Sequence, residues 1–320
     1  MKNIRTPIVY AAILASIAVV ALPAPAQTPP KSPTTAAEFI ASGTYKQFSD
    51  KAGAIADFTH AIELDPKNAE AYMDRGQVKT PGDDDGAIAD FTKAIELNPR
   101  LAEAFRGRGM AKKWKSDLED AKGDVEGAKR DLDSAIADFT RAIEMAPQLG
   151  DAFRDRGDAK KAKGDFDGAV GDLTRAIEID PKNFTYFAWR GDAKKAKGDY
   201  DGAVADYTKS IELVAEPTLQ TQEYYNRGDA KKAKGDYDGA VADYTKAIEL
   251  DDGNHMHGPT AYIHRGDAKK AKGDFDGAIA DYTKAIAIED AGEVNIFVAV
   301  HGPPGRSDGA GFPVKLATMD

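Results

Sequence analysis

The sequence predicts an all-α protein in which pairs of helices repeat along the chain. Near-identical stretches begin at Arg156, Arg190, Arg227 and Arg265, at a period of about 34 residues. Inside each stretch, apolar and small residues recur three or four positions apart, which is helical spacing. A Gly-Asp pair divides each stretch into two halves. Repetition of this kind is typical of stacked-repeat proteins, which present an extended surface rather than an enclosed pocket.

The first half of the unit near residue 151 predicts a helix with a closely packed face. Phe153 is followed four residues later by Gly157, and Ala159 and Ala162 continue a stripe of small residues. Side chains at this spacing lie on one face of a helix. Because the stripe is small, we expect a second helix to approach it closely.

The second half of the unit predicts the partner helix. Gly164 interrupts the helical pattern, and Asp165 or Asp167 can cap the next helix by accepting hydrogen bonds from its free N–H groups. A proline, Pro181, ends the run. The apolar residues between them have the spacing of a buried helical stripe and are Val170, Leu173, Ala176 and Ile177.

These residues resemble the tetratricopeptide repeat (TPR) family. With Gly157 at the family's eighth position, the aromatic, small, large, small and proline signature positions are filled by Phe153, Ala169, Leu173, Ala176 and Pro181. The resemblance implies a right-handed superhelical solenoid of about seven TPR helix hairpins. The unit departs from the family where Arg156 replaces the usual leucine and Lys160 the usual aromatic. We expect their aliphatic stems to line the hairpin while their charges reach water.

The same frame divides residues 36–290 into seven units. Their key glycines are Gly43, Gly76, Gly109, Gly157, Gly191, Gly228 and Gly266, in units near residues 36–68, 69–101, 102–149, 150–183, 184–220, 221–258 and 259–290. In the third unit, the segment from Gly109 to Ala135 is 14 residues longer than its counterpart from Gly157 to Ala169. We expect two extra turns in each helix, which form a spur of about 10 Å. Trp114 on this spur either packs the two helices together or anchors a partner.

The N-terminus predicts a protein directed out of the cytoplasm. Lys2 and Arg5 precede an apolar run over residues 8–22, and small residues suited to cleavage follow before Gln27. We expect a signal peptide over residues 1–26, a disordered leader over residues 27–35 and a periplasmic or secreted location. An uncleaved membrane anchor is the alternative, although the run is short for a span of about 20 residues.

Composition excludes several classes of partner and chemistry. Removing Lys2 and Arg5 from the 43 basic residues leaves 41 against 53 acidic ones, a net charge of −12. We therefore expect no nucleic-acid partner and no stable membrane insertion after signal cleavage. The chain has no cysteine, so disulfides, thiol catalysis and lipid attachment through a cysteine are excluded.

The resemblance also indicates which residues face the groove. First helices line the concave side of such arrays, with positions 2, 5, 9 and 12 pointing inward. Positions 9 and 12 pair an aspartate with a lysine in four units, which leaves no net charge to hold a partner's terminal carboxylate. Contacts with an extended peptide are expected at the variable position 5. The candidates are Asp158 with Lys161, Asp192 with Lys195, Asp229 with Lys232, Asp267 with Lys270, and Met73, Arg106, Arg154, Tyr225 and Ile263.

Catalytic signals are sparse. None of the five histidines lies in a nucleophile or metalloprotease motif, so we expect a non-enzymatic protein without cofactors. His255 and His257 follow two aspartates in a loop and form a weak candidate metal site, with a solvated loop as the alternative.

Residues 291–320 follow the array as a tail expected to be partly disordered or to form a short strand. The run over residues 294–300 is rich in β-branched residues, and Ile296, Phe297 and Val298 are expected to fold back over the end of the array or to pair with a partner.

The sequence therefore favours a protein-interaction scaffold of the bacterial cell envelope whose partner is a protein or peptide. A self-associating structural repeat protein, which would form a homo-oligomer, and a weak metal-binding or enzyme-accessory protein are the alternatives.

Overall fold

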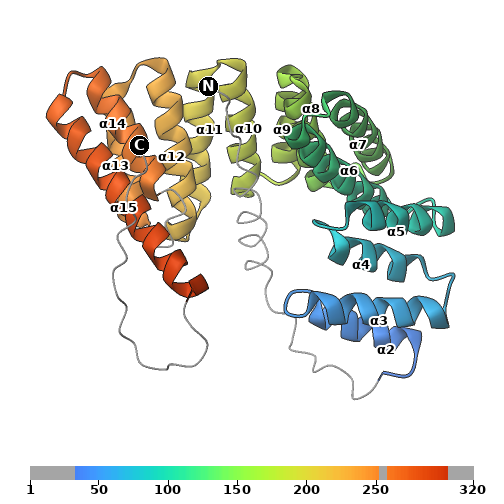
Figure 1. Cartoon of the computed structure of the whole chain (residues 1–320). Helices are drawn as coiled ribbons and strands as arrows, with labels where there is room; N and C mark the ends of the chain where they lie inside the picture. Colours follow the sequence, from blue (N-terminus) through green and yellow to red (C-terminus); the bar gives the residue numbers. More distant parts are fainter. Residues whose placement is uncertain (1–32, 252–257, 302–320) are drawn as a thin grey trace. The chain divides into compact units, whose positions relative to one another are not determined.

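A computed structural model describes residues 33–251 and 258–301, which form fourteen helices and no strand (Figure 1). The helices are α2 (Ala36–Lys46), α3 (Lys51–Leu64), α4 (Ala69–Lys79), α5 (Asp84–Leu97), α6 (Ala102–Lys122), α7 (Val125–Met145), α8 (Gly150–Lys163), α9 (Phe166–Ile179), α10 (Phe184–Lys197), α11 (Tyr200–Leu213), α12 (Pro217–Lys234), α13 (Tyr237–Leu250), α14 (Gly258–Ala271) and α15 (Phe275–His301). The predicted all-α class with seven hairpins is confirmed over these residues.

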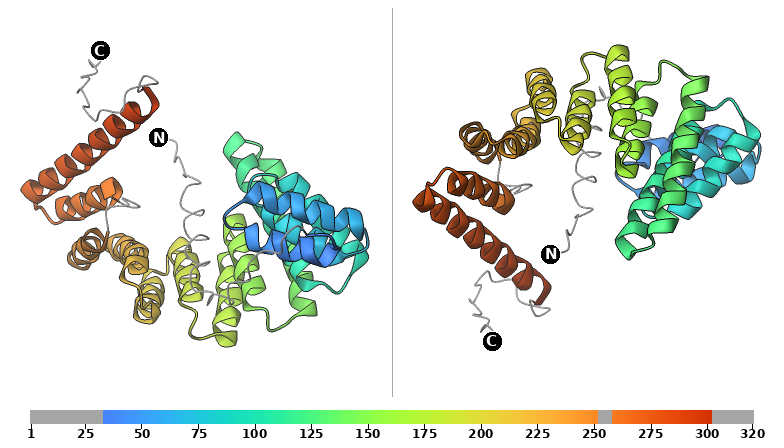
Figure 2. Two further views of the ribbon diagram at one scale, coloured as in Figure 1. Left: turned by 90° about the horizontal axis from the view of Figure 1, so that it is seen from below. Right: turned by 90° about the horizontal axis from the view of Figure 1, so that it is seen from above.

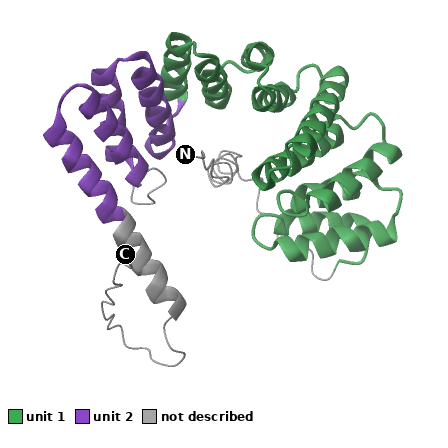
Figure 3. Ribbon diagram, turned by 45° about the horizontal axis from the view of Figure 1, so that its top comes forward, with its two compact units in different colours: residues 1–213 green, residues 214–320 purple. Residues whose placement is uncertain are grey.

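Successive helices pair into hairpins, and both views in Figure 2 show the two helices of each hairpin side by side. The chain divides into two compact units, residues 1–213 and 214–320 (Figure 3). The described part of the first unit contains α2 to α11, and that of the second contains α12 to α15. Within each unit, the second helix of one hairpin contacts the first helix of the next.

Each hairpin turn from the third hairpin on follows one local design. Gly164 ends α8 in the left-handed conformation, with φ at 87°, which costs a glycine nothing. Asp165 then caps α9 by accepting a hydrogen bond from the Gly168 N–H at 2.9 Å. Of the two predicted caps, Asp165 is therefore the one that forms. The same pairing of a left-handed glycine with an aspartate at the next position recurs at Gly123, Gly198, Gly235 and Gly273.

The core is a series of small clusters, each shared between neighbouring helices. Leu173 on α9 is 1% exposed and packs with Ala169 of its own helix and Ala193 of α10. Close approach is possible because the first helices carry glycine and alanine at the contact: a Cβ on Gly191 would lie 2.8 Å from the ring of Tyr207. The small-residue stripe therefore sets the spacing between helices.

The third hairpin carries the predicted extension. Its helices α6 and α7 contain 21 residues each, whereas α8 and α9 contain 14 each, so each is longer by about two turns. On this spur Trp114 is half-buried, with the Lys113 ammonium 5.9 Å from its ring centre, while Leu118 and Val125 are exposed.

The C-terminal expectation of a short strand is wrong over the described residues. Residues 294–300 belong to α15, which continues without interruption to His301. Extending an existing helix adds one hydrogen bond for each residue ordered, whereas a strand would need a pairing partner.

Several other expectations lie outside the described residues. They are the signal peptide, most of the leader, His255 and His257, and the last 19 residues of the tail. Within residues 33–251 and 258–301, no helix is both long and apolar enough to cross a membrane.

Candidate protein-interaction face

The arginine and lysine that depart from the family pattern do not extend their charges into water. The Arg156 side chain is only 16% exposed, and its guanidinium binds Asp172 on the second helix of its hairpin through Nε at 2.8 Å and Nη2 at 2.6 Å. Lys160 binds the same carboxylate at 2.8 Å. The prediction for these residues is wrong because Asp172, itself buried, supplies a partner at the hairpin interface.

This arginine also joins neighbouring hairpins. Its Nη1 donates a hydrogen bond at 3.1 Å to Thr140 on the second helix of the preceding hairpin. Arginine, aspartate and lysine form the same network in six hairpins, namely Arg75–Asp90–Lys79, Arg108–Asp138–Lys112, Arg156–Asp172–Lys160, Arg190–Asp206–Lys194, Arg227–Asp243–Lys231 and Arg265–Asp281–Lys269. Although burial opposes it, hydrogen bonds from Arg265 and Lys269 hold the pKa of Asp281 below its ordinary value.

In these networks the arginine and lysine of each hairpin are paired with an aspartate of the same hairpin, so their charges are not available to a ligand. The candidate interaction face therefore consists of the remaining polar side chains on the first helices. In the first unit α6, α8 and α10 follow one another in contact, so their side chains form a continuous surface.

Two predicted groove arginines meet in a buried cluster on this surface. Arg106 on α6 donates to Asp155 at 2.6 Å, and Arg154 on α8 donates to the same carboxylate at 2.7 Å. Arg154 also binds Asp151 at 2.9 Å, which accepts a hydrogen bond from the Tyr186 hydroxyl of α10 at 3.0 Å. Burial would raise the pKa of Asp155, but the two guanidinium groups outweigh it and hold that pKa below its ordinary value.

The predicted Asp158–Lys161 pair lies beside this cluster. Asp158 is 6% exposed and lies 3.2 Å from Lys161 on its own helix and 3.1 Å from Lys113 of α6. The two lysines overcome burial and lower the pKa of Asp158. The Lys161 ammonium lies 4.8 Å from the ring centre of Trp189, so the aromatic face is part of the same surface.

The next predicted pair is looser and more accessible. Asp192 and Lys195 lie 4.0 Å apart, and both are partly exposed. The Tyr207 hydroxyl donates to Asp192 at 2.6 Å from the second helix of the hairpin. At this point of the surface, Asp192 is held by the Tyr207 hydroxyl, whereas the ion pair of Lys195 with Asp192 is longer than the other pairs.

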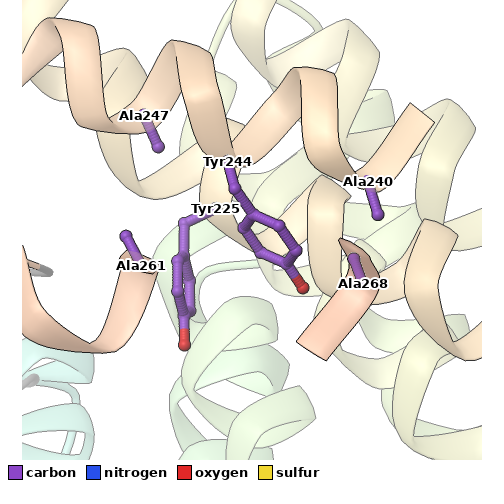
Figure 4. Close-up of a cluster of buried hydrophobic side chains, with 6 residues drawn as sticks. All are labelled: Tyr225, Ala240, Tyr244, Ala247, Ala261 and Ala268. Carbon is purple, nitrogen blue, oxygen red and sulfur yellow. The ribbon is translucent and has the colours of Figure 1, made fainter. Parts of the chain in front are cut away.

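In the second unit the predicted residues collect around a histidine. Asp229 accepts a hydrogen bond from the Tyr244 hydroxyl at 2.6 Å and lies 2.8 Å from Nδ1 of His264 on α14. The Tyr225 hydroxyl lies 2.9 Å from the same nitrogen. Figure 4 shows Tyr225 and Tyr244 packed among alanines of α13 and α14. Burial and the Asp229 charge raise the pKa values of both tyrosines, which therefore remain neutral.

The remaining candidates differ in accessibility. Lys232 lies 3.8 Å from Asp267 of the next hairpin, and Lys270 and Ile263 are exposed. Met73 packs against a core cluster and Tyr225 is 9% exposed. Among these position-5 residues Met73 is half-buried, Tyr225 is buried and Ile263 is exposed.

Sequence reasoning missed the residues that hold the predicted ones in place. Asp155 and His264 were not among the candidates, and neither were the six aspartates of the repeated networks. A signal was present for the networks, since an aspartate follows the arginine by 16 residues in most units. No group of three or more histidine and acidic side chains suited to a metal occurs in the described ranges.

Comparison with known proteins agrees with this architecture. Models of the tetratricopeptide repeat match residues 39–68, 109–149, 185–214 and 259–291 and residues 221–254, and a further TPR repeat model matches residues 157–198. Together these matches cover more than half of the chain, which belongs to the tetratricopeptide repeat family. No curated protein shows significant sequence similarity to it.

Solved structures show the same fold at low sequence identity. PilW, a type IV pilus biogenesis factor, is 20% identical, with 70% of this chain and 97% of that chain covered and a TM-score of 0.58. A tetratricopeptide repeat protein from Parabacteroides merdae is 19% identical, with 79% and 92% covered and a TM-score of 0.55. The Cut9–Hcn1 complex of the APC/C matches at 16% identity, with 78% and 46% covered and a TM-score of 0.58.

The family and the fold define a protein-interaction scaffold. Stacked helix hairpins of this kind are typical of non-enzymatic proteins that bind other proteins or peptides.

Proposed function

We propose that this protein is a non-enzymatic adaptor of the bacterial cell envelope that binds an extended peptide or a protein surface on the first-helix face. The observation that supports the peptide site is the continuity of α6, α8 and α10, along which Trp189, Lys161 and Lys195 lie partly exposed. An extended peptide can follow such a face over several hairpins and contact each in turn.

Charge on this face favours a peptide without a net charge of its own. Almost every cation there is already paired: Lys161 with Asp158, and Arg106 and Arg154 with Asp155. An acidic terminus would have to displace these carboxylates, so its electrostatic gain would be small. Apolar side chains stacked on Trp189 and backbone groups that hydrogen-bond to Lys195 and Asp192 suit the surface better.

The binding test uses a displayed library of short peptides selected on the full mature chain. We expect selected peptides to bind and Lys195→Ala together with Trp189→Ala to weaken them about tenfold or more. Lys209→Ala is the matched control, because Lys209 is an exposed lysine paired with Glu212 on the second helix of the same hairpin. Selected peptides whose affinity is unchanged by Lys195→Ala together with Trp189→Ala, or a library that yields no binder, would argue against the peptide site.

The envelope location rests on residues 1–26. We propose that this segment is a cleaved signal peptide and that the mature chain is periplasmic or secreted. Cell fractionation followed by N-terminal sequencing should place the mature start at Gln27. A chain recovered from the cytoplasm with Met1 intact would refute the location while leaving the binding face untouched.

A self-associating structural role is the competing proposal, and sedimentation of the purified chain over a range of concentrations separates the two. The adaptor proposal expects a single species at all concentrations.

A further inference from the structure

In the last described hairpin, one face of the second helix, α15, is exposed. On α3, α5, α7, α9 and α13 the corresponding face is covered by the first helix of the next hairpin. On α15 Phe275 is 62% exposed, Ile279 62% and Ile286 58%. The equivalent residues of α9 are Val170 and Ile177, which pack against the first helix of the next hairpin. Similar apolar pairs are covered in the same way on α3, α5, α7 and α13. The open face of α15 therefore has the composition of an interface rather than of a solvated surface.

A polar acceptor accompanies the two isoleucines. Thr283 lies between them on α15, at the position that Thr140 and Thr245 occupy on their helices. Those two threonines each accept a hydrogen bond at 3.1 Å from the arginine of the following hairpin, Arg156 or Arg265. Thr283 donates to the Ile279 carbonyl, as the other threonines do to theirs, and no arginine of the described residues reaches it.

The internal junctions define what fits this face. At the junction of α13 and α14, the covering helix contributes Ala261 and Ala268, which are at most 1% exposed, and Arg265 lies between them. Alanines at the same two positions also cover α5 and α7, namely Ala104 and Ala111, and Ala152 and Ala159. The covering helices α6, α8 and α14 thus share the pattern Ala-x-x-x-Arg-x-x-Ala, whose small residues allow close approach. On α10 the first alanine is replaced by Tyr186, whereas Arg190 and the last alanine, Ala193, are kept.

A second copy of this chain does not offer such a helix at its free end. At the three positions α2 carries Glu38, Ser42 and Tyr45; Ser42 is buried and donates to Asp57 of its own hairpin, and Tyr45 is 53% exposed. A tyrosine where the junctions have alanine or valine would hold the helices apart. The first helices that carry the arginine are already engaged in their own hairpin stacks.

We propose that the α15 face formed by Phe275, Ile279, Thr283 and Ile286 docks a helix of another protein that presents alanine, arginine and alanine at positions i, i+4 and i+7. The isoleucines receive the alanines, and Thr283 accepts a hydrogen bond from the arginine. This site is separate from the first-helix face and adds a repeat unit from a partner to the end of the array.

The test uses a synthetic peptide with the sequence of residues 258–272, which contains the pattern, stapled across positions 263 and 267 on the opposite face to keep it helical. Binding to the full mature chain is followed by fluorescence anisotropy. We expect saturable binding that is weakened about tenfold or more by Ile279→Asp or Ile286→Asp, because a carboxylate would be buried without a partner. A peptide with Arg265→Ala should lose about tenfold, as should the chain variant Thr283→Val.

Leu118→Asp is the matched control, since Leu118 is also exposed but lies on the spur. Its affinity for the peptide should equal that of the unaltered chain, and circular dichroism verifies that all variants fold. Absence of binding, or binding that Ile279→Asp leaves unchanged, would overturn the proposal. Self-association abolished by Ile279→Asp would assign the face to a second copy, and binding that appears only after deletion of residues 302–320 would assign it to the tail; either result also overturns it.

Discussion

Removing Asp172 tests the repeated arginine–aspartate–lysine network most directly. Its carboxylate accepts two hydrogen bonds from Arg156, at 2.8 and 2.6 Å, and lies 2.8 Å from Lys160. In Asp172→Ala the two cations remain side by side at a largely buried interface without a counter-charge. Breaking a buried ion pair costs about 3–5 kcal/mol. Because both cations retain some exposure, we expect a loss at the lower end, about 3 kcal/mol.

A matched control lies on the same hairpin. Arg175 and Glu178 form an ion pair of 2.7 Å, but both side chains are about half exposed. Glu178→Ala should therefore cost about 0.5 kcal/mol or less. Both variants remove a carboxylate that binds an arginine at nearly the same distance, but Asp172 is buried and also binds Lys160. The difference between them therefore measures burial together with the second cation.

The assay is urea unfolding followed by far-ultraviolet circular dichroism. Since repeat arrays can unfold in segments, native-state hydrogen exchange of α8 and α9 should accompany it. The loss in Asp172→Ala should appear in the exchange of these two helices and of α7, which the Arg156–Thr140 hydrogen bond joins to them. A loss below about 1 kcal/mol, or one equal to that of Glu178→Ala, would refute the reasoning.

Three further predictions concern single positions. Gly164→Ala should destabilise by about 1–2 kcal/mol because φ is 87° there, whereas Gly171→Ala, inside α9 with open space around it, should stabilise by about 0.5–1 kcal/mol; thermal melts of the pair check both signs. Leu173→Ala, at a residue 1% exposed, should cost about 2–5 kcal/mol, and a change under 1 kcal/mol in a urea titration would mean that the site is not close-packed. Burial, together with the Glu70 charge, raises the pKa of Asp74 to about 6. The folded state therefore binds this proton more tightly than the unfolded chain, so ionised Asp74 opposes folding above about pH 6 and the penalty disappears as the pH falls toward 4. Asp74→Asn should accordingly stabilise the protein at pH 7.5 and have little effect at pH 4, and equal effects at both values would contradict the shift.

The helices and their turns follow from residues close together in the sequence. Gly164 and Asp165 specify a left-handed end and an N-cap within two positions, so the corner was predictable from local rules. The spur was equally predictable, because seven extra residues on each side of an intact corner lengthen both helices by the same amount.

The polar interior depended on tertiary structure. Arg156 meets Asp172 across 16 residues, and Arg106 meets Asp155 across 49. The first pairing requires that a hairpin closes, and the second requires that hairpins stack. The 16-residue spacing of arginine and aspartate recurs in most units, but helical periodicity alone does not show that this pair of charges is buried. For the same reason Arg106 and Arg154, expected as peptide contacts, are paired with the buried Asp155. The β-prone run at residues 294–300 became helix because it continues α15. Residues close together in the sequence determine the helices and turns, whereas the partners of buried charges are determined only when distant helices come into contact.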